Sequence, residues 1–205
     1  MSTKAKARYV LLFIIPQLLI YFLLQRTFAA NEYNFLTPAD NLIPFISEFI
    51  WVYHSLLPVI LFTAIILLKS RKNFFTCYFA CLTAAISLMA FYILFPSFYP
   101  REELVGNSTS IWLVEATRLL DHANNTFPSN HVTFSWLMYL SAKCSQLAKK
   151  WKPLSVLYFI WASLITVSTL VLKQHFIVDV LSGIVLAHLS FYIAMKFVGY
   201  FHYEK

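Results

Sequence analysis

Long apolar runs alternate with short polar segments along almost the whole chain. The apolar runs cover about residues 9–26, 49–68, 74–95, 129–147, 153–172 and 175–197. Each run is close to the roughly 20 residues that an α-helix needs to cross the hydrocarbon core of a bilayer. The pattern predicts an all-α polytopic membrane protein with six transmembrane helices in one bundle. We expect residues 1–205 to form a single membrane-embedded domain.

Two of the polar segments are long. Residues 96–126 are rich in Pro, Ser, Thr and Asn, so we expect the longest loop of the protein there. Residues 26–47 contain Pro38 and Pro44 and are expected to form a second loop, in which a short interfacial helix would fit.

The first apolar run has two interpretations. Lys4, Lys6 and Arg8 precede it, which is typical of a secretory signal peptide. The uncharged stretch 9–25 is long for the apolar core of such a peptide. We therefore expect a retained first transmembrane helix with a kink at Pro16.

Composition supports a membrane protein. The 205 residues are 60% hydrophobic and 12% charged, with a mean hydropathy of +0.67, which is more apolar than a soluble domain of this size requires. The net charge of +7 would also be compatible with nucleic-acid binding. The basic residues lie next to the apolar runs, however, which indicates topology signals, so we expect no nucleic-acid partner.

The basic residues are unequally divided between the two sides of the predicted bundle. Twelve of the sixteen Lys and Arg residues fall on the side of both termini, and four, Arg26, Arg101, Arg118 and Lys173, fall on the other. By the positive-inside rule, both termini are then cytoplasmic. The compact length and short loops favour a bacterial inner membrane, with the opposite side facing the periplasm or the exterior.

Two polar clusters lie on that opposite side. The first, Phe127-Pro128-Ser129-Asn130-His131, opens the fourth apolar run. A Pro-Ser-x-His segment at a helix N-terminus offers free backbone N–H groups and a positive dipole end to an anion. His131 would place an imidazole beside that anion.

The second cluster contains His175 and Asp179, which are four residues apart and therefore share one helix face. A carboxylate behind an imidazole fixes the tautomer of the ring and raises its basicity. Asp179 alone would also fit the solvated first turn of a helix, where Asp is favoured. Beside Pro128, Ser129 and His131, a catalytic role is the interpretation that we prefer.

Together the two clusters resemble the type 2 phosphatidic acid phosphatase superfamily of membrane enzymes. The pattern of that family contains a Lys/Arg-Pro segment, a Pro-Ser-x-His segment and an Arg…His-x-x-x-Asp segment. The context of residues 121–132 looks closest to the branch with the inositol-phosphoceramide and sphingomyelin synthases.

The resemblance implies a metal-independent lipid phosphatase that acts through a phosphohistidine. His175 would be the nucleophile, Asp179 would orient it and His131 would be the general acid and base. Ser129 and Asn130, with neighbouring backbone N–H groups, would bind the phosphoryl oxygens of a lipid phosphate or diphosphate. No metal or cofactor is implied. The alternatives are a headgroup phosphotransferase that acts on a lipid hydroxyl and, in another class, a non-catalytic lipid-binding or transport protein.

The sequence departs from the family pattern at its cations. The Lys upstream of the Arg-Pro pair is absent, Arg101 is not followed by Pro, and Thr169 stands where the pattern has Arg. Arg101, Lys173 and Arg118 are the candidates for phosphate binding in their place. The alternative for each is a solvated loop cation. The identity of the lipid and the oligomeric state stay open.

Several other residues are expected to be structural. His54 and His188 would be packed or hydrogen-bonded, with a place facing the site as the alternative for His54. Asp121 and Asn125 would shape the loop before the Pro-Ser segment through hydrogen bonds. Gly183 would allow close contact between helices.

The three cysteines lie towards the predicted cytoplasmic side, where thiols stay reduced. Cys77 and Cys81 share one helix turn. A two-ligand metal site is one alternative there, but we expect small packing residues.

Overall fold

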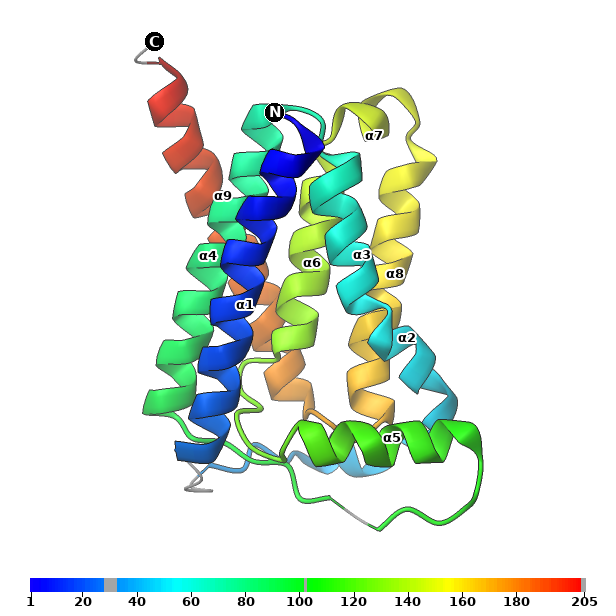
Figure 1. Cartoon of the computed structure of the whole chain (residues 1–205). Coiled ribbons are helices and arrows are strands. Elements are labelled where there is room, and N and C mark those ends of the chain that lie inside the picture. Colours follow the sequence, from blue (N-terminus) through cyan, green and yellow to red (C-terminus); the bar gives the residue numbers. More distant parts are fainter. Residues whose placement is uncertain (28–32, 102, 204–205) are drawn as a thin grey trace.

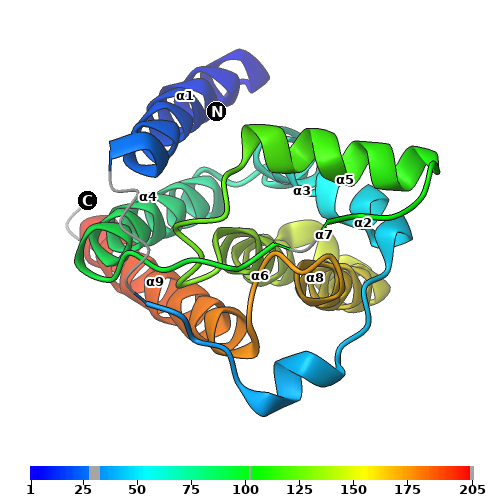
Figure 2. The same ribbon diagram turned by 90° about the horizontal axis from the view of Figure 1, so that it is seen from below.

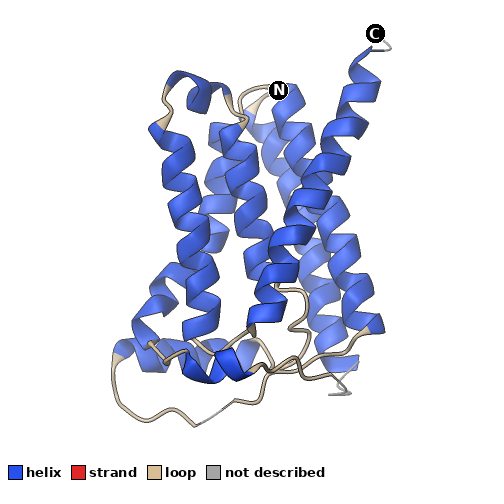
Figure 3. Cartoon of the chain, turned by 180° about the vertical axis from the view of Figure 1, so that it is seen from behind, coloured by secondary structure: helices blue, strands red, loops and turns tan. Residues whose placement is uncertain are grey.

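The computed structural model describes residues 1–27, 33–101 and 103–203. In that part of the chain the secondary structure is helical apart from two isolated bridges, Tyr33 with Ser97 and Phe98 with Asn124 (Figure 1, Figure 3). The α-helices are α1 Thr3–Thr27, α2 Ile50–His54, α3 Leu56–Leu61, α4 Arg71–Leu94, α5 Thr109–Leu120, α6 Asn130–Lys143, α7 Gln146–Lys150, α8 Pro153–Val171 and α9 Ile177–Tyr203. The 3-10 helices η1 Pro38–Leu42 and η2 Ser47–Phe49 and the π-helix η3 Phe62–Leu67 complete the set.

Five helical stretches of the described chain are long and apolar enough to cross a membrane. They are Thr3–Arg26, Ser47–Leu67, Arg71–Leu94, Pro153–Val171 and Ile177–Tyr200. The second of them is a continuous succession of η2, α2, α3 and η3. The all-helical class is therefore confirmed, with five spans of this kind in place of the six that we expected.

The difference lies in the run 129–147. Helix α6 ends at Lys143 after 14 residues, and the chain turns at Cys144 into the short α7. Fourteen residues extend only about 21 Å, which is less than the roughly 30 Å of the hydrocarbon core. The run 175–197 also differs at its start, because α9 begins at Ile177 and His175 lies in the preceding turn.

Helix α6 occupies the centre of the bundle (Figure 2). It contacts α4, α8 and α9, and its side chains Val132, Leu137 and Met138 are fully buried. A helix surrounded by protein can be short at membrane depth, because its neighbours and not lipid meet the backbone beyond its ends.

Different elements lie at the two ends of the bundle. The N-terminus, α7 and the C-terminus lie at one end, and α5 lies across the other (Figure 1). We expected only a loop at 96–126, and this was wrong for residues 109–120. Ser108 caps α5 by accepting a hydrogen bond from the Ile111 N–H, and Val114 is fully buried while Trp112 is 65% exposed, which makes α5 amphipathic.

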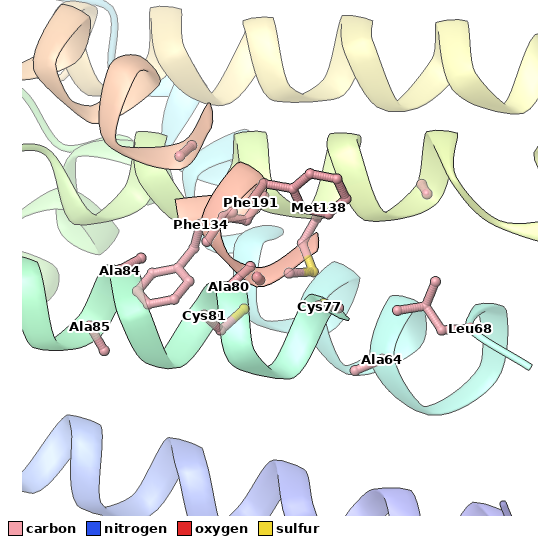
Figure 4. Packing of buried hydrophobic residues seen from close by; sticks show 14 of the residues in the cluster. Ala64, Leu68, Cys77, Ala80, Cys81, Ala84, Ala85, Phe134, Met138 and Phe191 are labelled. Atoms are coloured by element: carbon pink, nitrogen blue, oxygen red, sulfur yellow. The ribbon is translucent and has the colours of Figure 1, made fainter. Parts of the chain in front are cut away.

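The core between α4, α6 and α9 combines small and large side chains (Figure 4). Ala80 and Ala84 of α4 have no exposed surface, and Phe134 of α6 and Phe191 of α9 pack beside them. Cys77 and Cys81 are buried free thiols in the same cluster. Small residues on α4 therefore make room for the aromatic rings of the two helices that carry the site.

The first turns of α6 and α9 approach each other closely. The Ser129 N–H donates to the Asp179 carbonyl oxygen at 3.0 Å, and the Thr133 hydroxyl donates to the Gly183 carbonyl oxygen at 3.3 Å. A Cβ atom at Gly183 would lie 2.9 Å from the Ser129 carbonyl oxygen and 3.2 Å from Thr133 Oγ1. Ala187, one turn further, is fully buried. The expected close contact at Gly183 is confirmed.

We predict that Gly183→Ala destabilises the protein by about 1–3 kcal/mol, because the backbone oxygen of Ser129 cannot move without shifting α6. The same change at Gly199 is the matched control, since a Cβ there meets nothing within 4 Å. Gly199→Ala should leave stability unchanged or raise it by up to roughly 1 kcal/mol through helix propensity. Thermal unfolding of both variants measures this; equal melting temperatures would contradict the packing assigned to Gly183.

Candidate functional site

A small polar cavity lies where the loop before α6 meets the turn before α9. It brings together His131 and His175, which are 44 residues apart in sequence. The cavity is lined by Tyr21, Arg101, Asp121, His122, Asn124, Asn125, Thr126, Asn130, His131, Gln174 and His175. Four separate segments of the chain thus supply its walls.

His175 lies in a tight turn between α8 and α9. The Gln174 and His175 N–H groups both donate to the Thr169 carbonyl oxygen, at 3.0 and 3.3 Å. Nδ1 of His175 is 2.9 Å from the Thr126 carbonyl oxygen. A carbonyl oxygen can only accept, so Nδ1 carries a hydrogen, and in the neutral form of the ring the lone pair is then on Nε2. The turn therefore holds Nδ1 against a backbone oxygen and leaves Nε2 as the ring nitrogen that is not engaged by this hydrogen bond.

Asp179 lies behind this imidazole. Its Oδ2 is 3.5 Å from His175 Nδ1 and accepts a hydrogen bond of 2.9 Å from the Phe176 N–H. The side chain is fully buried, and among the described residues its Oδ1 has no hydrogen-bond partner. The pairing of His175 with Asp179 is present, but the shorter contact of Nδ1 is with Thr126. Sequence reasoning missed Thr126, because a backbone carbonyl has no residue-type signature.

His131 is the second residue of α6 and stacks on Tyr53 of α2. The two ring centroids are 3.8 Å apart and the rings are tilted by 21°. Tyr53 is only 2% exposed, so it restricts the plane in which the imidazole can lie. Nothing in the sequence around Tyr53 indicated this role, because the contact joins two distant helices.

Ser129 and Asn130 have different environments. Ser129 is fully buried and caps α6, with its Oγ accepting from the Val132 N–H at 3.4 Å, and it does not line the cavity. Asn130 does line it, and its buried Oδ1 has no hydrogen-bond partner in the described chain. The phosphate-binding roles given to both residues stay predictions.

Of the three candidate cations, Arg101 lines the polar cavity, whereas Lys173 and Arg118 do not. Arg101 lines the cavity, and its guanidinium donates to Gln174 Oε1 at 2.9 Å and to the Arg118 carbonyl oxygen at 3.0 Å. Burial lowers the pKa of Arg101 and the nearby Asp121 carboxylate raises it, but a guanidinium stays charged at neutral pH.

The other two cations contact groups outside the cavity. The ammonium group of Lys173, a residue with a φ of 55°, donates to the Asp40 carbonyl oxygen at 3.1 Å. The Arg118 guanidinium lies 5.9 Å from the centre of the Phe45 ring.

Asn125 was expected to shape the loop through side-chain hydrogen bonds, and this was wrong. It is 2% exposed and lines the cavity, and neither atom of its side-chain amide has a hydrogen-bond partner among the described residues. Its φ of 58° is a left-handed conformation that Asn tolerates better than most residues. An unpaired buried amide is costly, so this side chain is suited to a polar ligand in the cavity.

Asp121 links α1 to the cavity. Its Oδ1 accepts a hydrogen bond of 2.7 Å from the Tyr21 hydroxyl and another from the Gln25 side-chain amide. Asp121 therefore has the structural role that we expected. Across the described residues, no group of three His, Cys, Asp or Glu side chains lies close enough to hold a metal ion.

Comparisons with known proteins identify the family of the chain. A family model described as the PAP2 superfamily matches residues 96–203, more than half of the chain. An uncharacterized protein of Methanocaldococcus jannaschii is 39% identical over 75 residues, which are 37% of this chain and 27% of that protein. The matched stretch thus spans about a quarter of the length of that relative. No solved structure matches the chain.

We predict that Arg101→Gln weakens binding of orthovanadate, a tetrahedral oxyanion, by about 10-fold or more, because a charged hydrogen bond is worth roughly 1.5–3 kcal/mol. Lys173→Gln should change the affinity less than about 2-fold, since its ammonium group binds the Asp40 carbonyl oxygen. Isothermal titration calorimetry on the purified protein compares the two. A greater loss with Lys173→Gln would show that the cation of the cavity is wrongly assigned.

Proposed function

Because the chain belongs to the PAP2 superfamily, we propose that it is an integral membrane enzyme that hydrolyses a lipid phosphate or diphosphate through a phosphohistidine, without a metal ion. The observation that carries the proposal is the shared polar cavity of His131 and His175. A nucleophile with a free lone pair and a second imidazole beside it are what covalent phosphoryl transfer requires.

In the first step, Nε2 of His175 attacks phosphorus in line with the leaving oxygen. The N–P bond forms as the P–O bond breaks, and protonated His131 gives its proton to the leaving oxygen. The imidazolium that forms at His175 is stabilised by the Thr126 carbonyl oxygen and the Asp179 carboxylate behind Nδ1.

In the second step, neutral His131 removes a proton from a water molecule. The water oxygen bonds to phosphorus as the N–P bond breaks, which releases inorganic phosphate and restores both imidazoles. The negative charge on the phosphoryl oxygens is stabilised by the guanidinium of Arg101 and by the side-chain amides of Asn125 and Asn130, all of which line the cavity. Positioned donors of this kind can bind a phosphoryl group without a metal ion.

The membrane arrangement belongs to the same proposal. Helix α6 makes the sixth crossing, with α7 completing its path on the side of the termini. Both termini are cytoplasmic, following the excess of basic residues on their side, and the polar cavity opens to the opposite side of a bacterial inner membrane.

A headgroup phosphotransferase is the alternative within the same chemistry. The acceptor would then be a lipid hydroxyl in place of water. Thr169, where the family pattern has Arg, is the feature that favours it. The comparisons give no support for the branch of inositol-phosphoceramide and sphingomyelin synthases, which stays a prediction from residues 121–132.

His175→Ala and Asp179→Asn should each reduce turnover by at least roughly 100-fold, because they remove the nucleophile and the group that orients it. His188→Ala is the control, since His188 lies on the exposed side of α9 and contacts the Ile184 carbonyl oxygen. It should retain nearly full activity. Binding of a lipid phosphate to all three variants, measured beside turnover, tests the non-catalytic alternative; full turnover with His175→Ala and Asp179→Asn would exclude this mechanism.

Release of inorganic phosphate from phosphatidic acid separates hydrolysis from transfer. We expect release by the purified protein without any added acceptor, because water reaches a polar cavity at the end of the bundle. A dependence of release on an added lipid with a free hydroxyl would instead identify a transferase. The His175→Ala variant gives the background of both assays.

A further inference from the structure

A second cavity adjoins the polar one and is lined mainly by apolar side chains. It has a volume of about 220 Å³ and lies between α1, the α3–η3 segment, α4 and α6. Helix α1 contributes Val10, Phe13, Ile14, Gln17 and Leu18, which recur at the spacing of one helix face. The mechanism proposed above uses no part of these apolar walls.

The two cavities meet at the site of the proposed chemistry. His131 and Asn130 line both of them. A molecule with a phosphoryl group between His131 and His175 would therefore continue directly into the apolar cavity. The stacking of Tyr53 on His131 places an aromatic ring at the same junction, since Tyr53 also lines the apolar cavity.

The length of the apolar cavity can be read along the helices that line it. On α1 its lining extends from Leu18 to Val10, and on the α3–η3 segment from Leu56 to Ala64. Eight residues of α-helix rise by about 12 Å, which gives the length of the lining along α1. At the end away from His131, the lining side chains Ala64 and Phe74 are only 7% and 2% exposed. The cavity is thus elongated, with buried residues at its far end.

The volume limits what the cavity can hold. An engineered apolar cavity of about 150 Å³ in another protein holds one benzene molecule. The cavity of about 220 Å³ is spread over a length of about 12 Å, so it is narrow. A cavity of this shape fits one linear hydrocarbon chain and is too small for two.

Two residues of the cavity lining are also exposed on the surface of the bundle. They are Leu18 of α1 and Leu57 of α3, at 40% and 48%. Helix α1 packs mainly against α4 and η3 and lies at the edge of the bundle in Figure 2, and most of its apolar residues are not buried inside the protein. In a membrane these exposed side chains would face hydrocarbon, and we infer that a lipid chain enters on this side without passing through water.

We propose that this apolar cavity binds one unbranched hydrocarbon chain of the substrate, and that Ala64 and Phe74 set the length of chain that fits. The proposal rests on the function proposed above and specifies its substrate class: phosphate esters with a single linear chain next to the phosphate. A lipid with two chains would leave its second chain outside the cavity, against α1 or in the bilayer.

The test compares chain length in the full protein with and without a shortened cavity. Alkyl phosphates from butyl to hexadecyl are the probes, and p-nitrophenyl phosphate is the substrate without a chain. In the wild type, kcat/KM should rise with chain length and then level off. Ala64→Leu should lower kcat/KM for the longest chain by about 10-fold, because a pocket that loses the space of one or more methylene groups discriminates by roughly 10–200-fold. Its kcat/KM for p-nitrophenyl phosphate should change less than about 2-fold.

Ala148→Leu is the matched control. Ala148 on α7 is 4% exposed, as buried as Ala64, and does not line the cavity. Any reduction of kcat/KM by Ala148→Leu should be the same for all chain lengths. The inference is overturned if the wild type hydrolyses alkyl phosphates with no dependence on chain length, or if Ala64→Leu and Ala148→Leu give the same profile.

A second measurement does not require turnover. An alkyl phosphate with a photoreactive diazirine at the chain end should cross-link to residues near Ala64 and Phe74, and excess dodecyl phosphate should suppress the cross-link. If the wild type hydrolyses neither alkyl phosphates nor p-nitrophenyl phosphate, the proposed function fails while this cross-link still supports the chain site. Cross-links spread over the outer faces of α8 and α9 would overturn the chain site whatever the activity.

Discussion

The close approach of α6 and α9 is the constraint on which the site depends. The backbone of Asp179 accepts the Ser129 N–H at 3.0 Å, while its side chain lies behind His175. One residue thus joins the Pro-Ser segment to the imidazole of the other cluster. The absence of a side chain at Gly183 permits this distance, since a Cβ atom would lie 2.9 Å from the Ser129 carbonyl oxygen. Convergence of the two histidines follows from helix packing before any ligand is bound.

The site lies at a boundary between two kinds of environment. On one side of His131 the walls are amides, a guanidinium and a second imidazole; on the other they are apolar side chains of α1, α3 and α4. An amphiphile has the same division, with a charged group joined to a hydrocarbon chain. At Thr169, where the family pattern has Arg, the backbone carbonyl oxygen binds the N–H groups of Gln174 and His175. Gln174 in turn orients Arg101 at the cavity.

Much of this arrangement could be predicted from the spacing of apolar and polar residues. The features that could not be predicted are set by the conformation of the turns between helices. Helical spacing and apolar runs predicted the bundle and the small residue at 183. The pairing of His175 with Asp179 was also predicted, although His175 lies in the turn before α9 and not on a face of that helix. The break after Lys143 was missed, although Ser145 caps α7 by accepting from the Ala148 N–H and so resembles a helix start. Lys173 was expected near the anion because it is two residues from His175. Its left-handed backbone instead directs the side chain to Asp40, which no periodicity could reveal.

The most direct test of the account is the chemical trapping of a phosphoryl group on the protein. Wild-type protein would be mixed with a lipid phosphate, quenched in alkali within milliseconds to seconds, digested and analysed by mass spectrometry, because phosphohistidine survives alkaline but not acidic conditions. The account predicts one modified peptide with the phosphoryl group on His175, absent from His175→Ala. A phosphoryl group on His131 would contradict the assignment of the nucleophile, and turnover without any phosphorylated histidine would contradict the covalent mechanism.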